Sequence, residues 1–530
     1  MSYQSLMGKP ILNMYFAGNQ ANRDGYTFKV KNIVYDSEPV YKNKMAHVHL
    51  QMYYNGIHVI GGDSVVHIDA ATKAIKDFTK TMKYPIKTTP SEVSAAQSQV
   101  QAQPDGNVEV VFYSYAGGTA LAWDITKSGI APDQTPMVVH YIVDTEKGTT
   151  LLNFSETKTL QETGWPTKNL TYGFDGVDSQ VNNSEFNCSS VSLSNSIGQT
   201  MFSGLVDLST GSDGYHDFLL DIDRCCASTA MYIDAYLGCP GDLNHENVPG
   251  IHGGDVWGDR SVHDKFTSAA DAHYGHAATY DFYKNVFGRQ GVYDNEIGVH
   301  SRVHYGKGYN NAFWRAGNIF YGDGDGTKIL PLTSLEVAAH EFSHGVIEAT
   351  ADLIYYGESG GLNEATSDIM AILVDYNAMN RGFYNPNYLI GDQLFIQPGS
   401  FFRSMFKPSS DGRSYDCYCS SIGSVDVHYS SGVANHFFYL LAEGTWQGTP
   451  SPTCEPGDCR EATGTKTLTG IGRDKAGKIW YRALTRYFLP FSNYADARLG
   501  TIKAASFLFG STSKELKAVK DAWTAVNVFF

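Results

Sequence analysis

The chain has 530 residues, with 34 tyrosines, 28 phenylalanines, 53 glycines and a formal net charge of −15. This length predicts more than one domain with large buried cores, and the aromatic content excludes a largely disordered chain. The acidic charge argues against nucleic acid or an anionic membrane as a partner, and no apolar run is long enough to span a membrane.

The first third of the chain has the pattern of a β-rich region. Residues 46–69 alternate apolar and polar side chains across a Tyr-Asn-Gly turn, which is typical of a β-hairpin. Residues 108–123 and 137–154 predict further strands. Residues 88–106, rich in Ser, Ala, Gln and Pro, form either a helix or a linker.

Residues 155–192 show little apolar periodicity and are the expected junction between two parts of the chain. Four glycosylation sequons crowd this region and favour export; they begin at Asn153, Asn169, Asn182 and Asn187. The first twenty residues, however, show no basic segment followed by an apolar core, so no signal peptide is visible. Either the start is truncated or misassigned, or export uses another signal.

The most informative stretch is His340-Glu341-Phe342-Ser343-His344. On a helix, His340 and His344 share one face and can bind the same metal ion. Glu341 lies beside that face, where it can take a proton from water on the metal. The run from Thr333 to Glu336 predicts a capping box at the start of this helix. The pattern alone also fits an ordinary buried helix with two surface histidines.

A catalytic zinc site needs a third protein ligand, and Glu364 is the best candidate. It follows His344 by twenty residues, enough for a turn and a second, antiparallel helix. Asp368 falls on the same helical face and is placed to accept the outer N–H of a ligating histidine. Glu348, on the first helix, and Glu358, in the connecting loop, lack a helical partner at matching spacing.

The eight cysteines stand outside any metal-like CxxC pattern and predict disulfides in an oxidising compartment. Cys454 with Cys459 is the best single candidate pair. The alternative is a set of free thiols in a cytosolic protein.

Several motifs together resemble the thermolysin family of zinc endopeptidases, especially its vibriolysin and pseudolysin branch. They are HEFSH (340–344), GGLNEATSD (360–368), SVDVHYSSGVANHFFYLL (424–441), HYGKGYNNAFWRAGNIFYGDGDG (304–326) and GIGRDKAGKIWYRALTRYFLPFSNYADAR (470–498). The resemblance covers essentially the second two thirds of the chain, and the β-rich first third resembles the family's propeptide.

The resemblance implies an α+β fold in which a two-lobed metallopeptidase follows an α+β propeptide. The implied domains are a propeptide hairpin module (1–95), a second small propeptide module (96–165), a β-rich lobe ending in the zinc helix (166–345) and a helical lobe (346–530).

The resemblance also assigns roles to single positions. His340, His344 and Glu364 would bind zinc, with Asp368 behind them and Glu341 as the base. His428, oriented by Asp426, and Tyr355 would stabilise the oxyanion; thermolysin itself uses a carboxylate where this chain has Gly423. Substrate backbone would be held by Asn311, Ala312 and Arg403, and the apolar pocket would be formed by Ile329, Leu332, Val337, Ile390 and Phe402.

A calcium site is implied at Glu336, Asp375, Asn387 and the carbonyl of Leu389. One carboxylate of the family's site is Ile372 here, and Asn387 replaces an Asp, so calcium binding should be weakened. The GDGDG sequence at 322–326 is expected to be a tight turn rather than an ion loop.

The chain is therefore expected to be a secreted, monomeric zinc endopeptidase in its inhibited proenzyme form, cleaving before bulky hydrophobic residues. Its partners would be protein substrates and its own propeptide. The alternative function is a catalytically silent secreted protein that binds partners through its β-rich first third.

Overall fold

The computed structural model describes most of the 530-residue chain. The described residues are 25–36, 44–72, 74–80, 86, 88, 90–101, 107–115, 118–162, 192–212, 217–224, 227–231, 251–252, 255–295, 298–378, 385–446 and 449–529. Three of the four sequons, Cys188, Cys225, Cys226 and Cys239 lie outside these residues.

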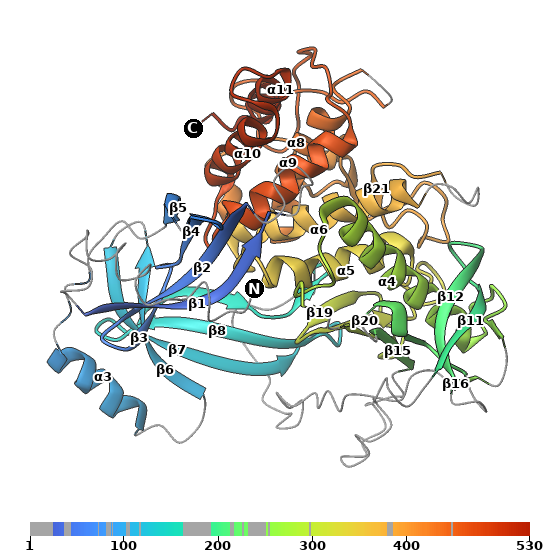
Figure 1. Ribbon diagram of the computed structural model, residues 1–530, viewed down its shortest axis with the longest axis horizontal. Coiled ribbons are helices and arrows are strands. Elements are labelled where there is room, and N and C mark those ends of the chain that lie inside the picture. The colour runs from blue at the N-terminus through green and yellow to red at the C-terminus, as the bar shows by residue number, and fades with distance from the viewer. Residues whose placement is uncertain are drawn as a thin grey trace.

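Residues 25–162, which we call the N-terminal unit, are built on a nine-stranded sheet (Figure 1). The predicted turn is present: Asn55 and Gly56 have φ values of 50° and 82° and join β2 to β3. Strand β2 pairs only briefly with β3; its long antiparallel partners are β1, from Tyr26↔Tyr54 to Tyr35↔Ala46, and β4, with six residue pairs from Met45↔Asp69 to Leu50↔Ser64. The 88–106 segment contains a helix, α3. The elements are β1 (Tyr26–Tyr35), β2 (Met45–Tyr54), β3 (Ile57–Ile60), β4 (Ser64–Asp69), β5 (Ile75–Lys80), α3 (Pro90–Gln101), β6 (Asn107–Tyr115), β7 (Gly118–Ile130), β8 (Pro136–Asp144), β9 (Thr150–Ser155) and β10 (Lys158–Thr159).

Two further sheets and a long helix follow. A six-stranded sheet has the order β10-β19-β20-β18-β15-β14, so the last strand of the N-terminal unit forms its edge. A five-stranded sheet has the order β16-β13-β12-β11-β17. Helix α4 contains the predicted helix 269–287 and is buried along most of its length. The elements are β11 (Ser192–Gln199), β12 (Leu205–Ser212), β13 (Asp217–Phe218), β14 (Leu220–Asp221), β15 (Ala227–Met231), β16 (Ile251–His252), β17 (Val256–Trp257), α4 (Lys265–Phe287), β18 (His300–Tyr305), β19 (Ala312–Arg315) and β20 (Asn318–Gly322).

The remainder of the chain is mainly helical, as the sequence predicts (Figure 1). One large apolar cluster runs through α4 to α11 and the adjoining strands. The elements are α5 (Leu335–Glu348), α6 (Gly357–Asn377), β21 (Leu389–Ile390), β22 (Arg403–Ser404), α7 (Val427–Ser430), α8 (Gly432–Ala442), α9 (Arg473–Arg486), α10 (Tyr494–Phe509) and α11 (Lys514–Ala525). Among the described helices none is long and apolar enough to cross a membrane.

Two disulfides cross-link the helical part, and they correct the predicted pairing of Cys454 with Cys459. The bridges are Cys417–Cys454 and Cys419–Cys459, with Cα–Cα distances of 5.9 and 5.3 Å. The backbone N–H of Cys417 donates to the carbonyl of Cys459, which lays the two cysteine-bearing segments side by side. Each cysteine of one segment therefore faces a cysteine of the other.

Candidate metal centre

Helix α5 carries His340, Glu341 and His344 and is buried from Leu335 to Ile347. The predicted capping box at its start is wrong. The N-cap residue is Ser334, which makes no side-chain capping bond, and Glu336 instead accepts from the backbone N–H of Gly391 at 2.8 Å. The helix is held by tertiary packing, since its side chains face β19, α4 and α6 rather than solvent.

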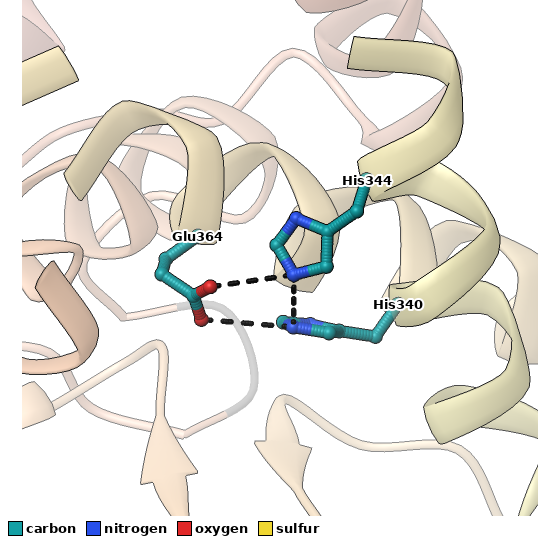
Figure 2. A group of neighbouring side chains, drawn as sticks. All are labelled: His340, His344 and Glu364. Atoms are coloured by element: carbon teal, nitrogen blue, oxygen red, sulfur yellow. Dashed lines mark hydrogen bonds and ion pairs between the residues drawn. The ribbon is translucent and has the colours of Figure 1, made fainter. Parts of the chain in front are cut away.

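His340, His344 and Glu364 converge on one point, as Figure 2 shows. His340 Nε2 lies 3.1 Å from His344 Nε2, and the Glu364 carboxylate oxygens lie 3.6 and 3.3 Å from these two nitrogens. All three side chains are fully buried, and their ligand atoms lie within 4.8 Å of one another. Two imidazoles and one carboxylate suit Zn²⁺ with an open fourth position, so the residues fit the metal that the sequence predicts.

The two candidate histidine ligands are oriented by side chains on α6. His340 Nδ1 lies 2.9 Å from Asp368 Oδ1, as the spacing predicts. His344 Nδ1 lies 2.8 Å from Asn363 Oδ1, a partner that the sequence analysis missed although it directly precedes Glu364. Glu358 belongs to the first turn of α6 and not to the connecting loop, which corrects that expectation.

The electrostatics leave His344 and Glu364 in the protonation states that a divalent metal requires. Burial lowers the pKa of His344 to about 4, so its imidazole is neutral. Burial opposes ionisation of Glu364, but the charge of His428 and the nearby histidines outweigh it and lower the pKa of Glu364 to about 2. A neutral imidazole and an ionised carboxylate are the forms that bind metal.

Glu341 is fully buried, and neither of its carboxylate oxygens has a hydrogen-bond partner among the described residues. Burial, followed by the negative charge of Glu364, raises the pKa of Glu341 well above its ordinary value. An unpartnered buried carboxylate is costly, and such groups concentrate at functional sites.

A cluster of three hydrogen-bonding side chains stands beside Glu364. The Tyr355 hydroxyl donates to Glu364 Oε1 at 2.5 Å and lies 3.0 Å from His428 Nε2. The opposite ring nitrogen of His428 lies 2.7 Å from Asp426 Oδ1. Burial lowers the pKa of His428, but the charges of Glu364 and Asp426 outweigh it and raise this pKa to about 9. His428 is therefore protonated at neutral pH and can donate a hydrogen bond from Nε2.

The end of the N-terminal unit lies between β19 and the side chains of Tyr355 and His428, a position that we call the groove. Strand β10 pairs antiparallel with β19, with Thr159 opposite Phe313. The Thr159 carbonyl oxygen lies 2.9 Å from His428 Nε2 and 3.2 Å from the Tyr355 hydroxyl oxygen. A carbonyl of this chain, that of Thr159, thus lies within hydrogen-bonding distance of both Tyr355 and His428.

The next two residues complete an extended strand along the groove. The Leu160 N–H donates to the carbonyl of Ala312 at 3.1 Å, and Arg403 Nη1 donates to the carbonyl of Leu160 at 2.6 Å. Gln161 exchanges two hydrogen bonds with the Asn311 side chain, at 3.2 and 3.0 Å. Residues that the sequence analysis assigned to substrate backbone therefore all contact this strand.

The Leu160 side chain is fully buried and belongs to the main apolar cluster. That cluster also contains the predicted pocket residues Ile329, Leu332, Val337 and Ile390, with Phe402 packed against it. Phe402 in turn contacts Phe395, with ring centroids 4.9 Å apart.

Arg403 and Asp368 form a bidentate ion pair, with both N–O distances 2.8 Å. Asp368 thus contacts a candidate metal ligand and the arginine that binds the Leu160 carbonyl. Burial opposes ionisation of Asp368, but Arg403 outweighs it and holds the pKa of this carboxyl well below its ordinary value.

A second acidic cluster lies around the predicted calcium residues. Burial, followed by the charge of Asp392, raises the pKa of Glu336 well above its ordinary value and that of Asp375 to about 7. One oxygen of Glu336 and one of Asp375 lack a hydrogen-bond partner among the described residues. The Asn387 side chain donates to Asp392 and accepts from the Leu389 N–H. The sequence analysis did not include Asp392 in the calcium site, although it stands only three residues after Leu389.

Similarity to known proteins agrees with this geometry. The model of the thermolysin metallopeptidase catalytic domain matches residues 196–348, and that of its alpha-helical domain matches residues 351–528. A bacillolysin from Bacillus cereus is 31% identical over 97% of this chain and 87% of its own length. The chain belongs to the thermolysin metallopeptidase family.

This thermolysin-family chain also carries the family's propeptide motif. The fungalysin/thermolysin propeptide motif matches residues 27–75, within the N-terminal unit. The transglutaminase-activating metalloprotease of Streptomyces mobaraensis is 36% identical over 94% of this chain and 60% of its own length. The solved precursor of protealysin, a metalloproteinase from Serratia proteamaculans, is 30% identical, with a TM-score of 0.41, over 51% of this chain and 81% of its own.

The chain spans 60% of the Streptomyces relative and about half the length of the thermolysins that it matches. The family's zinc site corresponds here to His340, His344 and Glu364.

Proposed function

We propose that this protein is a zinc-dependent endopeptidase made as an inhibited proenzyme. The observation that carries the proposal is the strand Thr159-Leu160-Gln161, bound in the groove with its backbone and Leu160 side chain held as a substrate would be. Such strand addition to a sheet edge is a general mode of peptide recognition.

The chemistry follows from the side chains around the Thr159 carbonyl. His340, His344 and Glu364 would hold zinc, which when bound supplies a Lewis acid that activates water and polarises the carbonyl. Glu341 would accept the proton of the attacking water and pass it to the leaving nitrogen. Protonated His428, oriented by Asp426, and Tyr355 would donate to the carbonyl oxygen as it gains negative charge.

We infer a preference for a bulky hydrophobic residue directly after the cleaved bond. In the bound strand that position is Leu160, which is buried in the main apolar cluster. One methylene in such a pocket is worth about 1–3 kcal/mol, so preference among Leu, Ile, Phe and Val should be graded. A charged residue would be rejected strongly, because burying an unpaired charge costs far more.

The same strand would inhibit the enzyme until it is cut. It fills the groove, and the N-terminal unit also contacts α9 through a buried ion pair between Asp36 and Arg482, 2.9 Å long. We propose Thr159–Leu160 as the first bond cleaved. The propeptide modules would then be residues 1–95 and 96–159, six residues short of the boundary expected from the sequence, and the catalytic lobes would be 160–345 and 346–530.

Three finer assignments complete the proposal. Glu336, Asp375 and Asp392, with Asn387 and the Leu389 carbonyl nearby, would hold one calcium ion of modest affinity. The disulfides favour an exported protein, since such bridges persist in oxidising compartments. The active form would be a monomer. It would belong to the vibriolysin and pseudolysin branch, because Asp426 lies beside His428.

The alternative is a catalytically silent secreted protein that binds partners through its N-terminal unit. Glu341 speaks against it, because a binding protein gains nothing from a buried carboxylate without a hydrogen-bond partner.

Activation of the purified chain tests the proposal. Full-length protein with zinc should hydrolyse casein slowly, and activity should rise as mass spectrometry detects a new N-terminus at Leu160. Leu160→Asp should slow this step strongly, because the side chain is fully buried, whereas Leu193→Asp, at a side chain that is 51% exposed, should not. Constant activity across the cut would overturn the proposed inhibition, and no hydrolysis before or after the cut would favour the alternative.

A further inference from the structure

Two charged side chains of the bound strand contact charged or polar groups of the groove. Lys158 stands two residues before the Thr159–Leu160 bond, and Glu162 stands three residues after it, counting Leu160 as the first. Neither contact involves the backbone, so each adds selectivity to the pairing already described.

On the first side, Lys158 Nζ lies 3.0 Å from Glu348 Oε2 at the end of α5. The Lys158 side chain is 11% exposed and that of Glu348 is 32% exposed. Trp314, on β19, donates from its indole nitrogen to the same Glu348 oxygen at 3.0 Å and fixes the carboxylate. Burial opposes ionisation of Glu348, but Lys158 and Trp314 outweigh it and lower the pKa of Glu348.

The two cations with the largest electrostatic effect on Glu348 belong to the N-terminal unit. Besides Lys158, the cation that acts on it electrostatically is Lys31, which is paired with Asp352. Both lysines precede the bond that would be cut. When the N-terminal unit leaves, the anionic carboxylate stays fixed beside the groove with only the Trp314 N–H as a partner among these groups.

On the other side, the Tyr429 hydroxyl donates to Glu162 Oε2 at 2.6 Å, and Arg413 Nη1 lies 3.4 Å from the same oxygen. Arg413 also donates to the Tyr429 hydroxyl. Tyr429 directly follows His428, and both Arg413 and Tyr429 lie after the Thr159–Leu160 bond, so they remain after the cut.

Resting on the proposed function, we propose that Glu348 and the Arg413–Tyr429 pair select substrates by charge. The preferred class is a protein segment with a basic residue two positions before the cleaved bond, a bulky hydrophobic residue directly after it and an acidic residue two positions further on. The segment Lys158-Thr159-Leu160-Gln161-Glu162 has this pattern. An acidic residue opposite Glu348 would meet a fixed like charge and be disfavoured.

The two subsites should differ in strength. Lys158 is mostly buried, and partly buried pairs are little screened by salt, so Glu348 should discriminate lysine from glutamate at least about tenfold. The side chains of Arg413 and Glu162 are 67% and 41% exposed. Exposed pairs contribute little, so this subsite should change selectivity only about two- to fivefold.

Fluorogenic peptides built on Lys-Thr-Leu-Gln-Glu test the proposal on the zinc-loaded, processed protein. The first residue is varied among Lys, Gln and Glu, and the last among Glu, Gln and Lys. We expect kcat/KM to fall in the order Lys, Gln, Glu at the first position. Glu348→Gln should abolish that order, and Arg413→Gln should abolish the order at the last position. The control is Glu515→Gln; the Glu515 carboxylate pairs with Lys475, so this variant should keep both orders.

Binding gives a readout that needs no turnover. The same peptides should show the same order of Kd with Glu341→Gln protein that the active enzyme has cut in trans, and the lysine preference should shrink at 1 M salt. Equal kcat/KM for all first residues, with normal cleavage before leucine, would overturn the charge selection and leave the proposed function intact. Absence of cleavage of every peptide, with the binding order preserved, would overturn the proposed function instead.

Discussion

Asp368 connects the metal centre to the groove through one carboxylate. It lies 2.9 Å from the ring nitrogen of His340 and forms two hydrogen bonds with Arg403, while Asn435 donates to it at 2.8 Å. A buried ion pair of this kind is stable only when its remaining hydrogen-bond positions are filled, as they are here. The position of the candidate zinc ligand and that of the Leu160 carbonyl are therefore set by the same group.

The base and the ligands should respond differently to substitution. Glu341→Gln keeps the shape of the site and all three candidate ligands but removes the proton acceptor. Zinc content should stay near one per chain, while hydrolysis should fall by roughly several orders of magnitude. The matched variant His344→Ala should lose the metal as well as the activity. Measuring the zinc content and the rate of peptide hydrolysis of each variant tests this prediction. Hydrolysis by the Gln variant at close to the parental rate would show that the mechanism is wrong.

At the scale of elements, α5 lies so close to β19 that one position has no room for a side chain. A Cβ on Gly345 would stand 2.6 Å from Trp314 Cη2 and 2.9 Å from Val292 Cγ1. Trp314 pairs with the bound strand through its backbone and holds Glu348 through its indole. Glycine is unfavourable inside a helix, so its presence here reflects the close approach of the two elements.

Gly345→Ala should therefore destabilise the protein although alanine is the better helix former. Overpacking costs about 1–3 kcal/mol, and the gain in helix propensity returns only about 1 kcal/mol. We expect a lower Tm by calorimetry on the zinc-loaded chain. Trp314→Phe removes the ring atoms that clash, so the double variant should be less destabilised than the sum of the two single changes. Strict additivity would contradict this account of the contact.

At the scale of the whole molecule, the N-terminal unit is attached to α9 by a buried cluster of histidines. His47 on β2 faces His67 on β4, with their Nδ1 atoms 2.6 Å apart. His47 Nε2 lies 3.1 Å from Asp36, which also pairs with Arg482 and, at 3.5 Å, with Arg486. With its Nε2–H donating to Asp36, His47 accepts at Nδ1 from His67. One of the two facing Nδ1 atoms must lack a proton, so the two rings cannot both be protonated in this arrangement.

The surrounding charges oppose protonation further. His49 lies 3.3 Å from the Thr485 carbonyl, and burial, followed by Arg486, His67 and Lys31, holds its pKa down at about 3 despite that bond. Burial likewise lowers the pKa of His67 to about 4, although Asp77 opposes the shift and Lys503 adds to it. Burial and the charges of Arg486 and Arg482 lower the pKa of His47 well below its ordinary value.

Attachment of the N-terminal unit should accordingly weaken in acid. The folded pKa values lie below the ordinary value of 6.5, so this stabilisation is complete above pH 6.5 and is lost as the pH falls toward 4. Each histidine should contribute up to about tenfold per pH unit in that window. Hydrogen exchange of 45–54, 64–69 and 473–486 in uncut Glu341→Gln protein measures it, with 514–525 as the reference.

Two conservative variants provide the controls for this effect. His49→Gln keeps a donor for the Thr485 carbonyl, and His67→Asn keeps a donor for His47, but neither side chain titrates. Each should flatten the acid-induced loss of protection, whereas His263→Gln, at an exposed histidine, should not. An unchanged pH dependence in both variants would show that other groups loosen the interface.

The metal centre could be predicted from the sequence because its spacing is local. Helical periodicity alone brings His340 to His344 and Glu364 to Asp368, so these pairs lie on shared faces wherever the helices pack. The roles of Tyr355, Arg403 and His428 rested on resemblance to the family, since no local pattern joins them to the metal ligands.

Only the tertiary structure decided the long-range contacts. The cysteine pairing followed from two loops that lie side by side. Glu336 does not form the expected capping box, because it accepts a hydrogen bond from the backbone N–H of Gly391, which is distant in sequence. The placement of Thr159-Leu160 in the groove likewise depends on the docking of a whole sheet, which no short pattern encodes. Sequence periodicity determines which residues share a face of one element, whereas packing between elements determines which faces meet.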